Sequence, residues 1–246
     1  MLLVYARFVF CALVFLCCYC DGQFLKFSGM KRSSPVPFPA CRADNIECLR
    51  RGLRTFFILM DAGHVGMKPV DPFLVNSVAV SLPEEQMSFL LRRANVTGGQ
   101  WTKLADRRFN VNGRSSSTFI SDLHVTGELN MRMANRLEPF VGYITMDIQE
   151  VESNITYPWR GINGIDNEDY ILIGTERIAI RNSRTPSYFL QPGNEDSRAI
   201  DKVLEAKPSI LDHLSNEITA ALMHSIVDNF RLFASTVPVR FYYKYY

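Results

Sequence analysis

Few residues in this chain have types and spacing suited to catalysis. The sequence contains no G-x-S-x-G elbow, no H-E-x-x-H motif, no P-loop and no G-x-G-x-x-G fingerprint. Its four histidines, His64, His124, His213 and His224, are dispersed along the chain. We therefore predict that the protein is not an enzyme and that it uses no cofactor.

The cysteines favour a disulfide over a metal site. Four of the six cysteines fall in the N-terminal apolar stretch, which leaves Cys41 and Cys48 in the rest of the chain. An even pair in an oxidising compartment favours one disulfide. A zinc site would need further ligands, and His64 is the nearest candidate. The acidic segment 161–170 (GINGIDNEDY) lacks the spacing of a calcium loop, so we predict no metal site.

The N-terminus has the layout of a secretory signal peptide. Arg7 precedes an apolar run at residues 8–19, and the small residues Cys20 and Gly22 close it. The run is shorter than the roughly 20 apolar residues of a membrane span, which favours cleavage over a retained anchor. We predict a signal peptide at residues 1–22 and a soluble, secreted mature protein.

Two sequons and the net charge describe the expected surface. Asn95-Val-Thr and Asn154-Ile-Thr agree with the secretory route and predict that both asparagines are exposed glycosylation sites. The formal net charge is +2 at pH 7. A charge so close to zero gives no reason to expect binding to nucleic acid or strong binding to anionic lipids.

The first structured element is predicted to be an amphipathic helix that follows an extended lead-in at residues 23–40. Apolar residues recur at spacings of three and four over residues 46–60. Asp44 is the expected N-cap, and Gly63 the expected C-terminal stop. Cys48 falls in or near the first turn, so a bridge to the other cysteine would fold the lead-in back onto the helix start.

Alternation of apolar and polar residues predicts unusually long strands. Segment 118–134 (TFISDLHVTGELNMRMA) alternates over about sixteen residues, whereas most strands have about five or six. The segment after Phe140 also alternates, with a change of phase near Gln149 that indicates a bulge. A third long strand is predicted over 170–180, broken at Gly174. Shorter strands are predicted at 74–82, 89–96 and 109–111.

The C-terminal part of the chain predicts a long buried helix. Apolar residues recur at helical spacing over residues 209–234, and the second half is apolar on most sides. Such a helix spans roughly 39 Å at 1.5 Å per residue, close to the roughly 45–50 Å of the long strands. Long twisted strands with one apolar face can curl around it. We therefore predict an α+β fold: a long C-terminal helix wrapped by a strongly curved antiparallel β-sheet, preceded by a short N-terminal amphipathic helix.

The space inside this wrapped sheet decides the function. If the sheet is wider than its helix, an apolar tunnel remains that suits a long lipid-like molecule. If side chains fill the space, the protein is an extracellular structural or protein-interaction module. A third interpretation is a lipid binder that acts at membrane surfaces.

Three features at the N-terminal end occur together: Cys41-x6-Cys48, the helix that follows, and GHVGMKPVDP at residues 63–72. This arrangement resembles the takeout and haemolymph juvenile-hormone-binding protein family. The order of long strands, Lys207-Pro208 and an apolar terminal helix is similar too, so the likeness covers about residues 41–238.

The resemblance implies a tubular lipid-binding fold, a Cys41–Cys48 disulfide and non-enzymatic carriage of small lipophilic molecules such as juvenile hormone. The hormone-carrier branch looks to have a second disulfide, and this chain has no cysteine after Cys48. The sequence is therefore closer to the takeout-like branch.

We predict that residues 41–246 form one domain that carries a small elongated hydrophobic ligand, a terpenoid or a fatty acid, in a haemolymph-like extracellular fluid. It is expected to be monomeric and to make no stable membrane insertion. The facing patterns place the first helix near one mouth, the strands in the wall and the terminal helix inside. The predicted ligand-binding residues are Phe56, Phe57, Met60, Leu123, Val125, Leu129, Met131, Ile144, Met146, Ile148, Ile218 and Leu222.

Overall fold

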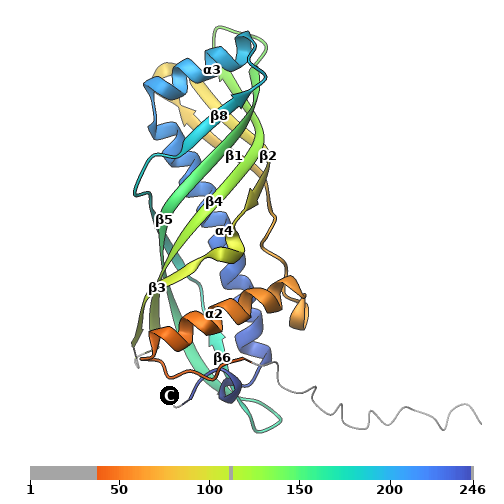
Figure 1. Cartoon of the computed structure of the whole chain (residues 1–246), viewed down its shortest axis with the longest axis vertical. Helices are drawn as coiled ribbons and strands as arrows, with labels where there is room; N and C mark the ends of the chain where they lie inside the picture. The colour runs from red at the N-terminus through yellow and green to blue at the C-terminus, as the bar shows by residue number, and fades with distance from the viewer. Residues whose placement is uncertain (1–37, 111–112, 245–246) are drawn as a thin grey trace, which may run out of the picture. The chain divides into compact units, whose positions relative to one another are not determined.

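The computed structural model describes residues 38–110 and 113–244 (Figure 1). The predicted signal peptide at residues 1–22 and most of the lead-in lie outside the described residues. The helices are α2 (Ile46–Asp61), α3 (Glu195–Ala206) and α4 (Ser209–Thr236), with short 3-10 turns η1 (His64–Gly66), η2 (Pro83–Glu85), η3 (Gly99–Trp101) and η4 (Val239–Phe241).

The strands form a curved antiparallel sheet built on one long hairpin. Strands β4 and β5 pair along most of their lengths, which are 20 and 24 residues. Shorter strands share their outer edges: β2 and β3 pair with β4, whereas β6, β7 and β8 pair with β5, and β1 pairs with β2. In chain order the strands are β1 (Phe73–Leu82), β2 (Met87–Thr97), β3 (Lys103–Asn110), β4 (Arg114–Met133), β5 (Phe140–Asn163), β6 (Asp169–Ile173), β7 (Arg177–Arg181) and β8 (Ser187–Gln191).

The predicted bulge in β5 is confirmed. Gln149 and Glu150 of β5 together face Asp122 of β4, as a bulge requires. Glu150 has a φ of 50°, and its backbone N–H donates to the Asp122 carboxylate at 2.8 Å. The flanking residues Ile148 and Val151 are both buried, so the bulge keeps the apolar face turned inward on both sides.

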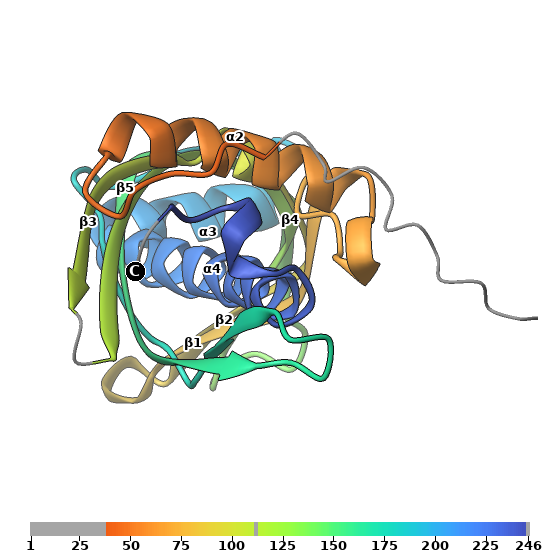
Figure 2. The same cartoon turned by 90° about the horizontal axis from the view of Figure 1, so that it is seen from below.

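Helix α4 is the enclosed element, as the sequence predicts. Figure 2 shows the strands curling around α4, with α2 lying along one side. The sheet supplies the other half of this core, through side chains such as Leu129 and Ile144, which are 0% and 1% exposed. The described helices include none that is long and apolar enough to cross a membrane. The buried residues of α4 include Leu214, Ile218, Leu222, Met223 and Phe233.

The two ends of the wrapped helix are covered by different helices. Helix α3, which the sequence analysis did not predict, packs on β5 near one end through Ile200 and Leu204 (Figure 1). Helix α2 lies toward the other end. Its N-cap is Asn45 rather than Asp44, because the Asn45 side chain accepts the Cys48 N–H at 3.0 Å. Gly63 follows the helix in the left-handed region at φ 65°, as predicted.

One strand prediction was wrong. The third long strand is two short ones, because β6 and β7 pair with different parts of β5. At the break, a Cβ on Gly174 would lie 2.8 Å from the Pro158 ring. The strand predicted at 74–82 is confirmed as β1, but its alternation changes phase between Val75 and Val78, which are both buried, while the register against β2 stays constant. Leu74 is 71% exposed. Strand β8 was also missed.

Candidate ligand cavity

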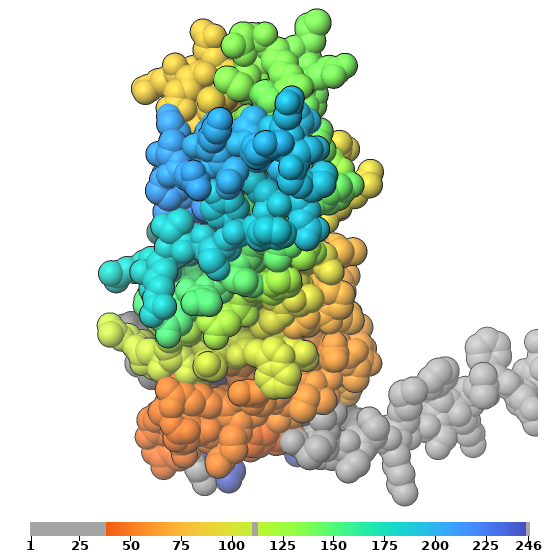
Figure 3. Space-filling model, turned by 45° about the horizontal axis from the view of Figure 1, so that its top comes forward, coloured from red at the N-terminus to blue at the C-terminus, as the bar shows by residue number. Residues whose placement is uncertain are grey.

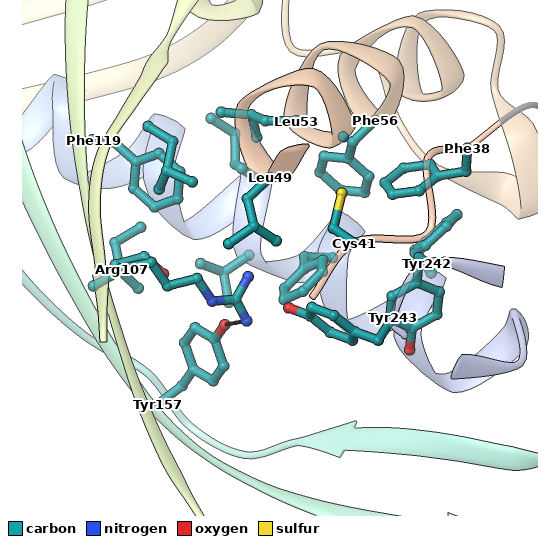
Figure 4. A pocket seen from close by; sticks show the side chains of 18 residues that line it. Phe38, Cys41, Leu49, Leu53, Phe56, Arg107, Phe119, Tyr157, Tyr242 and Tyr243 are labelled. Atoms are coloured by element: carbon teal, nitrogen blue, oxygen red, sulfur yellow. Dashed lines mark hydrogen bonds between the residues drawn. The ribbon is translucent and has the colours of Figure 1, made fainter. Parts of the chain in front are cut away.

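An apolar cavity of about 90 Å³ lies at the α2 end of the wrapped helix (Figure 4). Its walls come from α2, β3, β4, β5, the C-terminal half of α4 and the tail that follows α4. In the space-filling view of Figure 3, the atoms of α2 form part of the outer surface at this end. The apolar lining includes Leu49, Leu53, Phe56, Leu104, Phe119, Ile155, Ile226, Val227, Phe230 and Phe233.

Aromatic rings from three segments of the chain form one side of the cavity. Phe56 of α2 makes edge-to-face contacts with Phe230 and Phe233 of α4, at centroid distances of 5.8 and 5.7 Å. Tyr242 of the tail packs against Phe233 at 5.4 Å, and Phe38 packs against the same ring at 5.4 Å. Pairs at these distances are attractive beyond their buried area, so the rings hold the three segments together.

Arg107 of β3 brings a charge into this apolar site. Figure 4 shows its guanidinium reaching between Leu49, Tyr157 and Tyr243. Its Nη2 donates to the Tyr157 hydroxyl at 3.5 Å, and its Cζ lies 5.3 Å from the centroid of the Tyr243 ring. The Nε atom is shielded from solvent and has no hydrogen-bond partner among the described residues. The cavity therefore holds a cation whose donors are only partly used.

The surroundings of Arg107 keep it charged and keep the phenol of Tyr243 neutral. Burial raises the pKa of Tyr243 to about 12, although the positive charge of Arg107 acts in the opposite direction. Burial acts to lower the pKa of Arg107, but its interactions with Tyr243 and Tyr157 outweigh this, and the pKa is raised. At neutral pH the site thus contains a guanidinium cation beside a protonated phenol.

The disulfide ties the elements around the cavity together. Cys41 is bonded to Cys48 in the first turn of α2, which confirms the predicted bridge. The Cys41 N–H donates to the Tyr242 carbonyl at 3.0 Å, and the Lys244 N–H donates to the Cys41 carbonyl at 2.9 Å. On the other side of α2, Arg50 Nε donates to the Leu104 carbonyl of β3 at 2.9 Å. Helix α2 is therefore fixed both to the tail and to the sheet.

The GHVGMKPVDP segment is held by two polar side chains. Asn229 of α4 accepts the Lys68 N–H and donates to the Lys68 carbonyl, both at 2.8 Å. Further on, the Asp71 carboxylate accepts the Gly98 N–H at 2.9 Å and the Gln100 N–H at 3.4 Å. The segment therefore links the end of α2 to α4 and to the turn before β3.

Of the twelve predicted ligand-binding residues, only Phe56 lines this cavity. Phe57 lies instead beside a shallow surface groove with Trp101, and Met60 is fully buried and contacts Asn229. The other nine lie in the packed core between the sheet and α4, and each is at most 3% exposed: Leu123, Val125, Leu129, Met131, Ile144, Met146, Ile148, Ile218 and Leu222.

The sequence analysis missed the polar and tail residues of the site. Arg107 lies in a short strand among polar neighbours, where periodicity carries little information. Tyr242 and Tyr243 belong to the aromatic-rich C-terminal stretch VRFYYKYY. This unusual composition is the feature of the sequence from which they could have been predicted as site residues.

The remaining candidate residues lie elsewhere. The described residues contain no group of three or more His, Cys, Asp or Glu that could hold a metal ion. His124 pairs with Asp147 at 2.6 Å on the exposed face of the sheet. Of the two sequon asparagines, Asn154 is exposed, whereas Asn95 is half-buried and its Oδ1 is shielded.

The described residues thus form a strongly curved antiparallel sheet around a long helix, with an apolar cavity beside that helix. Takeout 1 of Epiphyas postvittana has this fold: its crystal structure superposes with a TM-score of 0.69 at 13% sequence identity, covering 84% of this chain and 100% of that chain. A lipopolysaccharide binding protein is less similar, with a TM-score of 0.45 and 8% identity over 80% of this chain and 39% of that chain. By sequence, no family model and no curated protein matches the chain.

Proposed function

We propose that the protein is a secreted, non-enzymatic carrier that binds a small lipophilic ligand in the cavity at the α2 end. The observation that carries this proposal is a cavity lined mostly by aliphatic and aromatic side chains, within a tubular lipid-binding fold. Ligand sites are concave, mostly apolar and equipped with a few polar groups. This cavity has those three properties.

The size of the cavity implies that its wall moves when the ligand enters. Its volume of about 90 Å³ is well below the roughly 300–1,000 Å³ of typical ligand pockets. A micromolar complex corresponds to about 8 kcal/mol. At about 25 cal/mol per Å², that requires burying roughly 330 Å² of apolar surface before association costs. A ligand of that size needs α2 or the tail to shift outward.

The proposal extends to the oligomeric state, the compartment and the cargo of the protein. The domain at residues 41–246 acts alone as a monomer, in a haemolymph-like extracellular fluid, and its cargo is a terpenoid or a fatty acid. The Cys41–Cys48 disulfide supports an oxidising compartment. The exposed Asn154 supports passage through the secretory route, where it is available for glycosylation.

The proposal is tested by filling the cavity. Leu53 lines the cavity from α2, and L53W places an indole in its space. Ile58 is on the same helix but 69% exposed, so I58W adds the same ring outside and is the matched control. Delipidated protein is titrated with an environment-sensitive apolar dye, which is then displaced with a terpenoid or a fatty acid.

We expect the wild type and I58W to bind the dye alike and L53W to bind it at least about tenfold more weakly, a loss of about 1.4 kcal/mol. Equal binding by L53W would move the site away from this cavity. If the dye does not enter the wild type, the carrier proposal is wrong. A filled-core extracellular interaction module would then be the better interpretation.

A further inference from the structure

The charge of Arg107 has no carboxylate partner in the described part of the chain. An arginine offers five N–H donors, and those of Arg107 reach only the phenols of Tyr157 and Tyr243 among the described residues. The adjacent acid, Asp106, pairs instead with Arg108 on the outer face, at 3.3 Å. Arg107 is half-buried, and charges withdrawn from water in proteins are normally paired, because removing an ion from water is costly.

The neighbours of Arg107 supply orientation without neutralising it. Tyr243 presents its ring to the guanidinium, and the ring of Phe109 lies 6.0 Å from the same Cζ atom. Such cation–π contacts hold the planar group in place. Tyr157 and Tyr243 offer hydroxyl groups and not carboxylates, and burial keeps the Tyr243 phenol protonated at neutral pH because it raises its pKa to about 12. The result is an oriented fork of donors at the wall of an apolar cavity, the geometry that suits a carboxylate.

We propose that the cavity takes a lipophilic carboxylic acid, whose carboxylate binds Arg107 and whose hydrocarbon chain lies against the rings of Phe56 and Phe230. This inference rests on the proposed carrier function and narrows its cargo. A carboxylate accepts two N–H bonds from a guanidinium side by side, which uses the donors left open here. The hydrocarbon part is either a straight chain or a terpenoid, because the aromatic wall recognises only apolar area.

The test compares acids with their own methyl esters on the wild-type protein. Decanoic acid with methyl decanoate, and farnesoic acid with methyl farnesoate, differ within each pair mainly in charge. Each compound displaces the apolar dye at neutral pH. Hydrogen bonds to a charged group contribute about 1.5–3 kcal/mol, so we expect each acid to bind about 10–150-fold more tightly than its ester. The two pairs together distinguish the straight-chain and terpenoid sources.

Three variants assign the preference to Arg107. In R107M the acid loses its advantage while the ester binds as before, and R107K recovers part of it because an ammonium cannot form the two-pronged contact. The matched control is R108M, which removes the same charge one residue along on the outer face, where the side chain is 85% exposed. We expect R108M to keep the full preference for the acid. Thermal unfolding of each variant reports whether it is folded.

The outcomes separate this inference from the carrier proposal. Equal affinity of acid and ester for the wild type, or an equal loss of both in R107M, overturns the carboxylate site and leaves the carrier intact. If neither the dye nor any probe enters the wild type, the carrier fails and the carboxylate site fails with it. The acid preference of the wild type needs no variant, so misfolding of R107M does not remove the test.

Discussion

Asn229 offers a sharp test of how the α2 end is held. It is a buried polar residue (4% exposed) of α4, and its amide makes two hydrogen bonds of 2.8 Å with the backbone of Lys68. N229A removes both the amide oxygen that accepts the Lys68 N–H and the amide nitrogen that donates to the Lys68 carbonyl. Each buried hydrogen bond contributes about 1–1.5 kcal/mol, so we expect N229A to lower the free energy of unfolding by about 2–3 kcal/mol.

The control for N229A is the same change on the same helix. Asn216 is half-buried, and its Oδ1 has no hydrogen-bond partner among the described residues. N216A therefore breaks no such bond, and it carries the same gain in helix propensity as N229A. We expect N216A to change stability by less than about 0.5 kcal/mol in either direction.

The assay is urea unfolding followed by far-UV circular dichroism, together with a thermal scan. For a domain of this size, a loss of about 2–3 kcal/mol lowers Tm by about 4–12 °C. Equal stabilities of N229A and N216A would show that the link from Asn229 to Lys68 does not hold the fold. The GHVGMKPVDP segment would then owe its conformation to its own turns.

Three further predictions concern the remaining parts of the fold. Replacing both Cys41 and Cys48 by serine removes a crosslink between residues with a sequence separation of 7. The chain-entropy relation for a loop of that length gives a loss of about 2.4 kcal/mol in the free energy of unfolding, which urea unfolding measures. Burial alone raises the pKa of Glu176, but hydrogen bonds from His224 and Arg231 lower it below the usual 4.5. E176Q therefore costs about 1–2 kcal/mol at pH 7. The difference shrinks as the pH falls below about 4.5, where the carboxylate of the unfolded wild type protonates first, and it is lost as the pH falls through the lower pKa of the folded state; urea unfolding from pH 7 to pH 3 follows it. Ile144→Val, in the packed core, costs about 0.5–1.5 kcal/mol and leaves dye affinity unchanged, whereas weaker dye binding would place the ligand along the central sheet.

The elements that could be predicted from sequence are those with long periodic patterns. The alternation around residues 118–134 is confirmed as part of β4, and the phase change near Gln149 is confirmed as a bulge. Helix α4 is confirmed from its apolar spacing. Short elements such as α3 and β8 were missed, because five to twelve residues give few repeats and much of their surface is exposed.

The position of the cavity could not be predicted in the same way. A facing pattern says that Leu129 or Ile218 points inward, and both do, but it cannot say whether the space they point into is full. That depends on the distance between packed elements and on side-chain shape, which are properties of the assembled core. Arg107 was missed for a related reason, since its inward direction depends on the register of β3 against β4.

The difference between the two halves of the interior has a physical explanation in side-chain shape. Near the middle of the sheet, the core is built from Leu, Ile, Val and Met, whose branched or flexible chains interdigitate and fill gaps. At the α2 end, flat rings such as Phe56 and Phe233 meet edge to face at 5.7 Å, and such rigid rings cannot adapt to irregular gaps as methionine does.

The pairing of the strands also favours a cavity at the α2 end. Residues 159–163 of β5 pair with β6 in a separate ladder, and the described part of β3 ends at Asn110. Fewer paired strands therefore surround the end of α4 than its middle. The part of the cavity wall that is formed by α2 and the tail can move outward at less cost than the sheet, because fewer backbone hydrogen bonds must break. The same residues that leave the cavity small therefore make it the part of the core best able to widen around a ligand.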